Sequence, residues 1–166
     1  MRVLGIDCGG EYTGYGIVEQ DDAGHLHCVA WGAVRLNTRR PLPERLSQIF
    51  HELHTVIEQH QPEVAAVEDV FYAANAKSAL KLGHVRGVAL LVASECRLPV
   101  SEYAPLAIKS AVVGYGKADK VQVQQMVTRL LRLESAPEPQ DASDALAVAI
   151  CHLHTAQTLA RHAAAK

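Results

Sequence analysis

The sequence lacks a long hydrophobic run, a large net charge and a secretory signal. Its 166 residues include 16 Lys and Arg against 18 Asp and Glu, a formal net charge of −2, so no overall positive field draws the chain to nucleic acid. The longest uncharged apolar runs, at residues 87–94 and 145–151, are far shorter than the roughly 20 residues that span a bilayer. Asp7 interrupts the N-terminal apolar stretch before a signal-peptide core is reached. We therefore expect a cytoplasmic protein without a membrane span.

Cysteine is also scarce. The four cysteines, at positions 8, 28, 96 and 151, are far apart and form no Cys-x-x-Cys pair. This spacing argues against a zinc knuckle and against a thiol redox motif.

Charge is distributed unevenly along the chain. Residues 70–133 carry nine basic and three acidic side chains, a net charge of +6, whereas the rest of the chain has a net charge of −8. Such asymmetry indicates a basic face beside an acidic site. On charge alone, the alternative that solvated helices simply carry lysine stays open.

Hydrophobic periodicity predicts alternating strands and helices. Short apolar runs predict five strands, at residues 2–7, 13–19, 26–36, 62–68 and 98–103. Apolar residues at helical spacing predict helices at residues 43–60, 75–95, 105–113, 119–133 and from 140 to beyond 152. This order favours an α/β fold with a mixed sheet and crossover helices. Length and composition fit one domain, assigned to residues 1–158, and we expect the alanine-rich tail at 159–166 to be frayed.

Acidic side chains end two of the predicted strands. Asp7 ends the first strand and Glu68 ends the fourth, and a right-handed crossover through the helix at 43–60 would place these strands side by side. Asp141 and Asp144 are three residues apart in the first turn of the final helix, so they share a helix face. We expect the four carboxylates to meet at one edge of the sheet.

A carboxylate cluster of this kind suits Mg²⁺ or Mn²⁺ rather than zinc. Two ions about 4 Å apart would polarise a water on one side of a phosphodiester and stabilise the leaving oxygen on the other, which predicts phosphodiester hydrolysis. A purely structural explanation stays open for Asp141 and Asp144, because acids in a first turn commonly complement the helix dipole. Asp7 and Glu68 are harder to explain without a ligand, since burying an unpaired charge costs several kcal/mol.

Five ordered sequence blocks narrow the interpretation. They are Gly-Ile-Asp (5–7) with Thr-Gly-Tyr-Gly (13–16), Val-Glu-Asp-Val-Phe (67–71), Asn75 with residues 78–83 and 86–87, Val-Val-Gly-Tyr-Gly (112–116), and the run at 141–150. In this order and spacing they resemble the RuvC family of Holliday-junction resolvases, over nearly the whole chain. The resemblance implies a ribonuclease-H-like fold, with a mixed five-stranded sheet flanked by helices. It also implies a metal-dependent endonuclease that resolves four-way DNA junctions by paired symmetric nicks in homologous recombination and DNA repair.

The resemblance assigns roles to individual residues. The four catalytic carboxylates of the family, which hold two divalent ions, correspond to Asp7, Glu68, Asp141 and Asp144. The catalytic basic residues near them correspond to Lys109 and Lys120, each of which could pair with a phosphate. Phe71 matches an aromatic that stacks on unstacked bases, and Tyr72 is a second candidate for that role. The remaining predicted contacts to the DNA backbone are Lys77, Lys81 and Lys117, beside Lys109 and Lys120. Core packing of Phe71 and simple solvation of each lysine are the structural alternatives.

Two positions depart from the family pattern. Cys8 stands where members commonly have proline, and Ala74 stands where relatives are often basic, so one phosphate contact is missing unless Lys77 replaces it.

The resemblance further implies a homodimer formed through the helix that begins near Asn75, and work with the branch-migration proteins RuvA and RuvB. A two-fold dimer presents two identical sites, as symmetric nicks require. Two alternatives stay open: a related nuclease acting on RNA or RNA/DNA hybrids, and a junction-binding protein without catalysis. A third, an actin-like ATPase, is disfavoured because such proteins need two domains to close on a nucleotide.

Overall fold

The computed structural model describes residues 1–69 and 76–164. Its strands are β1 (Arg2–Cys8), β2 (Tyr12–Gln20), β3 (Leu26–Arg35), β4 (Val64–Glu68) and β5 (Val100–Tyr103). Its helices are α1 (Leu42–His60), α2 (Ala76–Glu95), α3 (Pro105–Val113), α4 (Lys120–Leu130) and α5 (Gln140–Ala164). Within the described residues, these elements follow the order that the sequence predicts.

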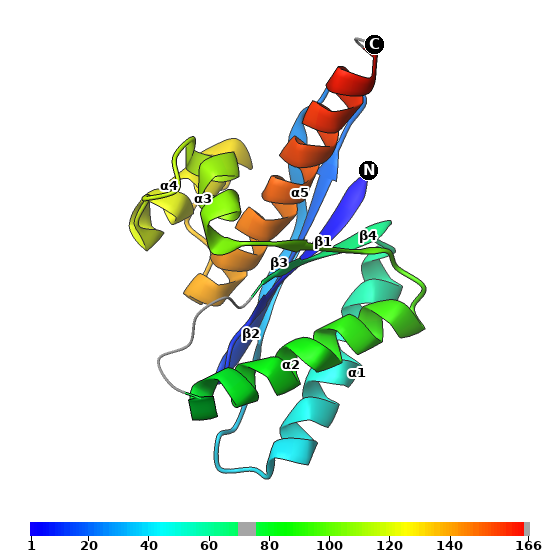
Figure 1. Ribbon diagram of the computed structural model, residues 1–166, viewed down its shortest axis with the longest axis vertical. Helices are drawn as coiled ribbons and strands as arrows, with labels where there is room; N and C mark the ends of the chain where they lie inside the picture. The colour runs from blue at the N-terminus through cyan, green and yellow to red at the C-terminus, as the bar shows by residue number, and fades with distance from the viewer. Residues whose placement is uncertain (70–75, 165–166) are drawn as a thin grey trace.

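The strands form one mixed sheet in the order β3-β2-β1-β4-β5. β2 is antiparallel to both β1 and β3, whereas β1, β4 and β5 run parallel. Four strands, β1, β3, β4 and β5, therefore end at the same edge of the sheet. Helices α1 and α2 cover one face and α3, α4 and α5 cover the other (Figure 1). The predicted α/β architecture with a mixed five-stranded sheet is confirmed.

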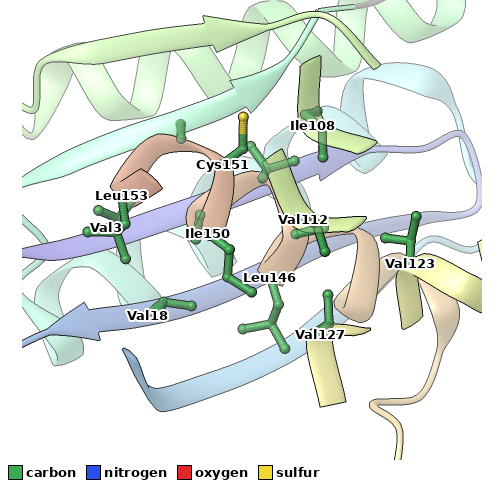
Figure 2. Packing of buried hydrophobic residues seen from close by; sticks show 14 of the residues in the cluster. Val3, Val18, Ile108, Val112, Val123, Val127, Leu146, Ile150, Cys151 and Leu153 are labelled. Carbon is green, nitrogen blue, oxygen red and sulfur yellow. The ribbon is translucent and has the colours of Figure 1, made fainter. Parts of the chain in front are cut away.

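Strands β1 to β4 each contribute to two hydrophobic cores, because successive side chains point to opposite faces of the sheet. Val3 and Val18 pack with α5 side chains such as Leu146, as Figure 2 shows. Leu4 packs on the other face with α1 side chains such as Ile49. The odd-numbered positions of β1 therefore face α5.

Glycines in β1 and β2 let α5 lie directly on the sheet. A methyl group at Gly5 would sit 2.0 Å from the carbonyl oxygen of Ala145, and one at Gly14 would sit 2.0 Å from the carbonyl oxygen of Asp141. Side chains essentially never make carbon contacts below 3.0 Å. The missing side chains therefore set how close the first turn of α5 comes to the sheet.

Prolines shorten two strands relative to the prediction. The sequence predicts strand starts at residues 62 and 98, but β4 starts at Val64 and β5 at Val100. Pro62 and Pro99 carry no backbone N–H for a ladder hydrogen bond, so each strand begins after its proline.

Helix ends differ in a similar way. Asp119 is the N-cap of α4 rather than its first residue. The same helix ends at Leu130 instead of the predicted residue 133, and Arg132 after it has a left-handed backbone with a φ of 53°. Helix α5 continues to Ala164, so the domain boundary predicted at residue 158 falls inside a helix and stays a prediction. None of the described helices is long and apolar enough to cross a membrane.

Candidate active site

Asp7 and Glu68 end neighbouring parallel strands. The register pairs Ile6 of β1 with Val67 of β4, so the next residue on each strand, Asp7 and Glu68, lies beside the other. Odd-numbered positions of β1 and even-numbered positions of β4 face α5. Both carboxylates therefore point toward the face that carries the other two predicted acids.

The first turn of α5 brings Asp144 to these carboxylates. Asp7, Glu68 and Asp144 line one cavity of about 120 Å³. Asp141 lies at its margin rather than in its lining, close to the turn after β1, since a methyl group at Gly9 would sit 3.2 Å from the Asp141 Oδ1. Three of the four predicted acids thus share a cavity, and the fourth is near enough for its charge to act on Asp7.

The carboxylates repel one another inside this partly buried site. Burial, together with the charges of Glu68 and Asp144, raises the pKa of Asp7 well above its usual value. Asp7 and Glu68 share a hydrogen bond, and burial raises the pKa of Glu68 as well. For Asp144, burial raises the pKa although the Lys120 ammonium opposes that shift. The site therefore favours a bound cation or a retained proton.

Two lysines border the acids. Lys109 and Lys120 line the same cavity, and the Lys120 Nζ lies 3.1 Å from the Asp144 Oδ2. Burial lowers the pKa of Lys120, but Asp144 and the other acids outweigh it, so the net shift of the pKa is upward. Lys120 is the first residue of α4 and is held there by a capping box, in which Asp119 accepts from the Gln122 N–H and Gln122 accepts from the Asp119 N–H.

The other predicted DNA contacts lie outside this cavity. Lys77 and Lys81 are exposed on α2, and Lys117 is exposed in the turn between α3 and α4. Phe71 and Tyr72 fall outside the described residues. Cys8, beside Asp7, is buried, and burial raises the pKa of its thiol to about 12, so it is not a thiolate near neutral pH.

The donors at this site fit a hard divalent cation. The acids offer only carboxylate oxygens, and the cavity lining contains no His or Cys of the kind that zinc prefers. A bound cation would also relieve the repulsion that raises the pKa of Asp7. Within residues 1–69 and 76–164, no three His, Cys, Asp or Glu side chains form a ready-made metal cage, and Lys120 occupies one oxygen of Asp144. Metal binding would therefore need the carboxylates to rotate toward one another.

Comparison with known proteins decides the family. Residues 3–152 match the family described as crossover junction endodeoxyribonuclease RuvC. This chain belongs to the RuvC family. The RuvC of Koribacter versatilis (strain Ellin345) is 68% identical over 161 residues, which cover 97% of each chain. The RuvC of Acidobacterium capsulatum is 58% identical over 165 residues, which cover 96% of each chain.

Solved RuvC structures share the fold. Thermus thermophilus RuvC in complex with a Holliday junction substrate superposes with a TM-score of 0.87 at 32% identity, covering 95% of this chain and 96% of that one. The yeast mitochondrial Holliday junction resolvase is only 16% identical but superposes with a TM-score of 0.69, covering 96% of this chain and 82% of its own, which is a likeness of fold. The predicted ribonuclease-H-like fold is confirmed.

The sequence prediction missed the residues that hold this RuvC site together. Gly14, paired with Asp7 across β1 and β2, fixes the approach of Asp141, and the Asp119–Gln122 capping box fixes Lys120. The signals were present in the sequence: alternate glycines in the first two strands, and Asp-x-x-Gln ahead of a helical run.

Proposed function

We propose that this RuvC-family chain resolves four-way DNA junctions by hydrolysing phosphodiester bonds in paired symmetric nicks. The observation that carries the proposal is the cavity in which Asp7 and Glu68, at two strand ends, face Asp144 of α5. The relatives named crossover junction endodeoxyribonuclease, and the Thermus thermophilus RuvC structure with its Holliday junction, support this substrate. Homologous recombination and DNA repair are the processes that produce such junctions.

The family's metal dependence is assigned to four side chains. Asp7, Glu68, Asp141 and Asp144 would hold two divalent ions, Mg²⁺ or Mn²⁺. Such ions, when bound, supply a polarised water and stabilise the departing oxygen. The carboxylates must be ionised to bind them, so the raised pKa of Asp7 makes proton release part of metal binding.

Lysines would act on the phosphate. Lys120 keeps 67% of its side chain exposed while it pairs with Asp144, so its ammonium can turn from the carboxylate toward a phosphate oxygen. Lys109 of α3, which lines the same cavity, would stabilise the charge that develops on the same phosphate. Contact with the DNA backbone is proposed for Lys77, Lys81 and Lys117, and base stacking for Phe71 and Tyr72.

A homodimer is proposed through α2. Leu80 and Leu91 are 66% and 51% exposed and lie three helical turns apart on one face. Gly83 and Gly87 lie between them with open space where a side chain would be, which permits close approach of a second helix. Work with RuvA and RuvB, and a cytoplasmic location, are predictions that rest on the family and the sequence.

The test compares cleavage of a synthetic four-way junction, a plain duplex and an RNA/DNA hybrid, each with Mg²⁺, Mn²⁺ or a chelator. We expect metal-dependent, symmetric nicks in the junction alone. Asp7→Asn and Asp144→Asn should abolish cutting while junction binding persists. Preferential cutting of the hybrid would instead indicate a ribonuclease, and full activity of either variant would reject the metal assignment.

A further inference from the structure

A second group of basic side chains lies at the edge of the sheet that carries the acids. Its members, here called the arginine surface, come from the end of β3, the β3–α1 loop, α1 and α2: Arg35, Arg39, Arg40, Arg45 and Lys81. The sequence prediction placed the basic face at residues 70–133 and, apart from Lys81, did not include these residues. The segment at residues 35–45 and Lys81 of α2, which are far apart in sequence, form this surface together.

The turn after β1 joins the arginine surface to the acidic cavity. β3 ends at the same edge of the sheet as β1 (Figure 1), and the Leu36 N–H donates to the Glu11 carbonyl over 2.8 Å. Glu11 lines two open cavities on this side. Arg35 and Arg39 also line the first, of about 470 Å³, and Arg45 and Lys81 also line the second, of about 200 Å³. On its other side the same turn lies close to the acids, since a methyl group at Gly9 would sit 3.2 Å from the Asp141 Oδ1.

The charges of these cations are not neutralised by ion pairs in the part of the chain that the structure describes. Two arginines elsewhere are paired, Arg2 with Glu19 at 2.9 Å and Arg86 with Asp69 at 3.4 Å. Among the described residues, no member of the arginine surface forms an ion pair. The Arg45 Nε is buried without a hydrogen-bond partner in that same part of the chain. Residues 35–45 carry four arginines against one acid, Glu44, and Glu11 lines both cavities beside them. This excess of positive charge leaves room for an external anion.

The loop is also built to hold its arginines in place. The Asn37 side chain accepts from the Arg39 N–H over 3.0 Å, and the Asn37 carbonyl accepts from the Arg40 N–H over 2.9 Å. The Gln48 side chain donates to the Arg35 carbonyl over 3.2 Å. A fixed backbone lowers the entropy cost of presenting guanidinium groups, whose planar donors match phosphate oxygens.

We infer that the arginine surface binds the phosphate backbone of a DNA arm as that arm leaves the acidic cavity. This inference rests on the proposed function. DNA cut at the cavity continues past the turn at residues 9–11, and the arginine surface is the basic surface on the far side of that turn. The role is positioning: these side chains hold the arm and do not touch the reacting phosphate.

Salt-dependent binding tests the inference. In an Asp7→Asn background, the dissociation constant for a synthetic four-way junction is measured across a KCl series, with and without Arg35→Ala/Arg39→Ala/Arg40→Ala. Each phosphate contact contributes about 0.9 to the slope of log affinity against log salt. We expect the triple variant to lower that slope by about 2 to 3 and to weaken binding at about 0.1 M salt by more than 10-fold.

A matched control removes the same charge elsewhere. Arg97→Ala/Arg129→Ala/Arg132→Ala changes three exposed arginines remote from this surface and should leave the slope near that of the parent. An unchanged slope in the first triple variant overturns the inference while the proposed function stands. Failure of the Asp7→Asn parent to bind any junction would instead reject the proposed function. If the triple variant does not fold, Arg39→Ala alone should lower the slope by about 1. An unchanged slope in that single variant would also overturn the inference.

Discussion

Gly14→Ala is expected to damage the active site although Gly14 carries no functional group. The added methyl would lie 2.0 Å from the Asp141 carbonyl oxygen and 2.4 Å from its carbonyl carbon. The first turn of α5 must therefore retreat by at least about 1 Å to reach even a tight contact of 3.0 Å. Overpacking of this kind costs about 1–3 kcal/mol of stability, and a displacement of about 1 Å at catalytic groups costs about 100-fold in rate.

Single-turnover cleavage of a four-way junction measures the rate, and urea denaturation measures the stability. Gly10→Ala is the matched control, since it lies four residues away and has open space where the methyl would go. We expect Gly10→Ala to cut at the normal rate and Gly14→Ala to cut about 100-fold more slowly. Normal rate and normal stability in Gly14→Ala would refute the reasoning that glycine sets the position of Asp141.

Three further outcomes are expected. At pH 7 without metal, Asp7→Asn should melt at a higher temperature than the natural protein. The pKa of Asp7 is raised in the folded state, so the folded protein keeps a proton on Asp7 at pH values where the unfolded chain, with the usual aspartate pKa of 3.8, has released it. The natural protein therefore loses stability as pH rises through that window, and melts near pH 3 should show the two proteins converging. Lys120→Ala should change stability by less than about 1 kcal/mol, because the Lys120 side chain is 67% exposed and its charge is screened by water. The same variant should slow single-turnover cleavage by about 100-fold. If the proposed dimer forms through α2, the natural protein should sediment as a dimer and Leu91→Glu as a monomer.

The acids were predictable because local patterns carry them. A short apolar run that ends in Asp7 or Glu68 marks a strand end, and the three-residue spacing of Asp141 and Asp144 marks one helix face. Parallel pairing of β1 and β4 then follows from a right-handed crossover. The roles of Lys109 and Lys120 came from the family resemblance, since nothing local separates them from other surface lysines.

Long-range contacts explain what was missed. The depth of α5 depends on Gly14 meeting Asp141, residues far apart in sequence. The arginine surface joins the segment at residues 35–45 to Lys81 of α2 at one edge of the sheet. Residues 35–45 carry four arginines against one glutamate, but a charge count over long stretches averages them with the acidic residues around them. It therefore detected the basic stretch at 70–133 and passed over the basic groups beside the acids.

Anomalous diffraction from crystals grown with Mn²⁺ tests the central claim most directly. The claim is that Asp7, Glu68, Asp141 and Asp144 form one site for two divalent ions. We predict two anomalous peaks about 4 Å apart among these carboxylates, with Lys120 released from Asp144. Peaks found only elsewhere on the protein, or none at this edge of the sheet at saturating Mn²⁺, would contradict it.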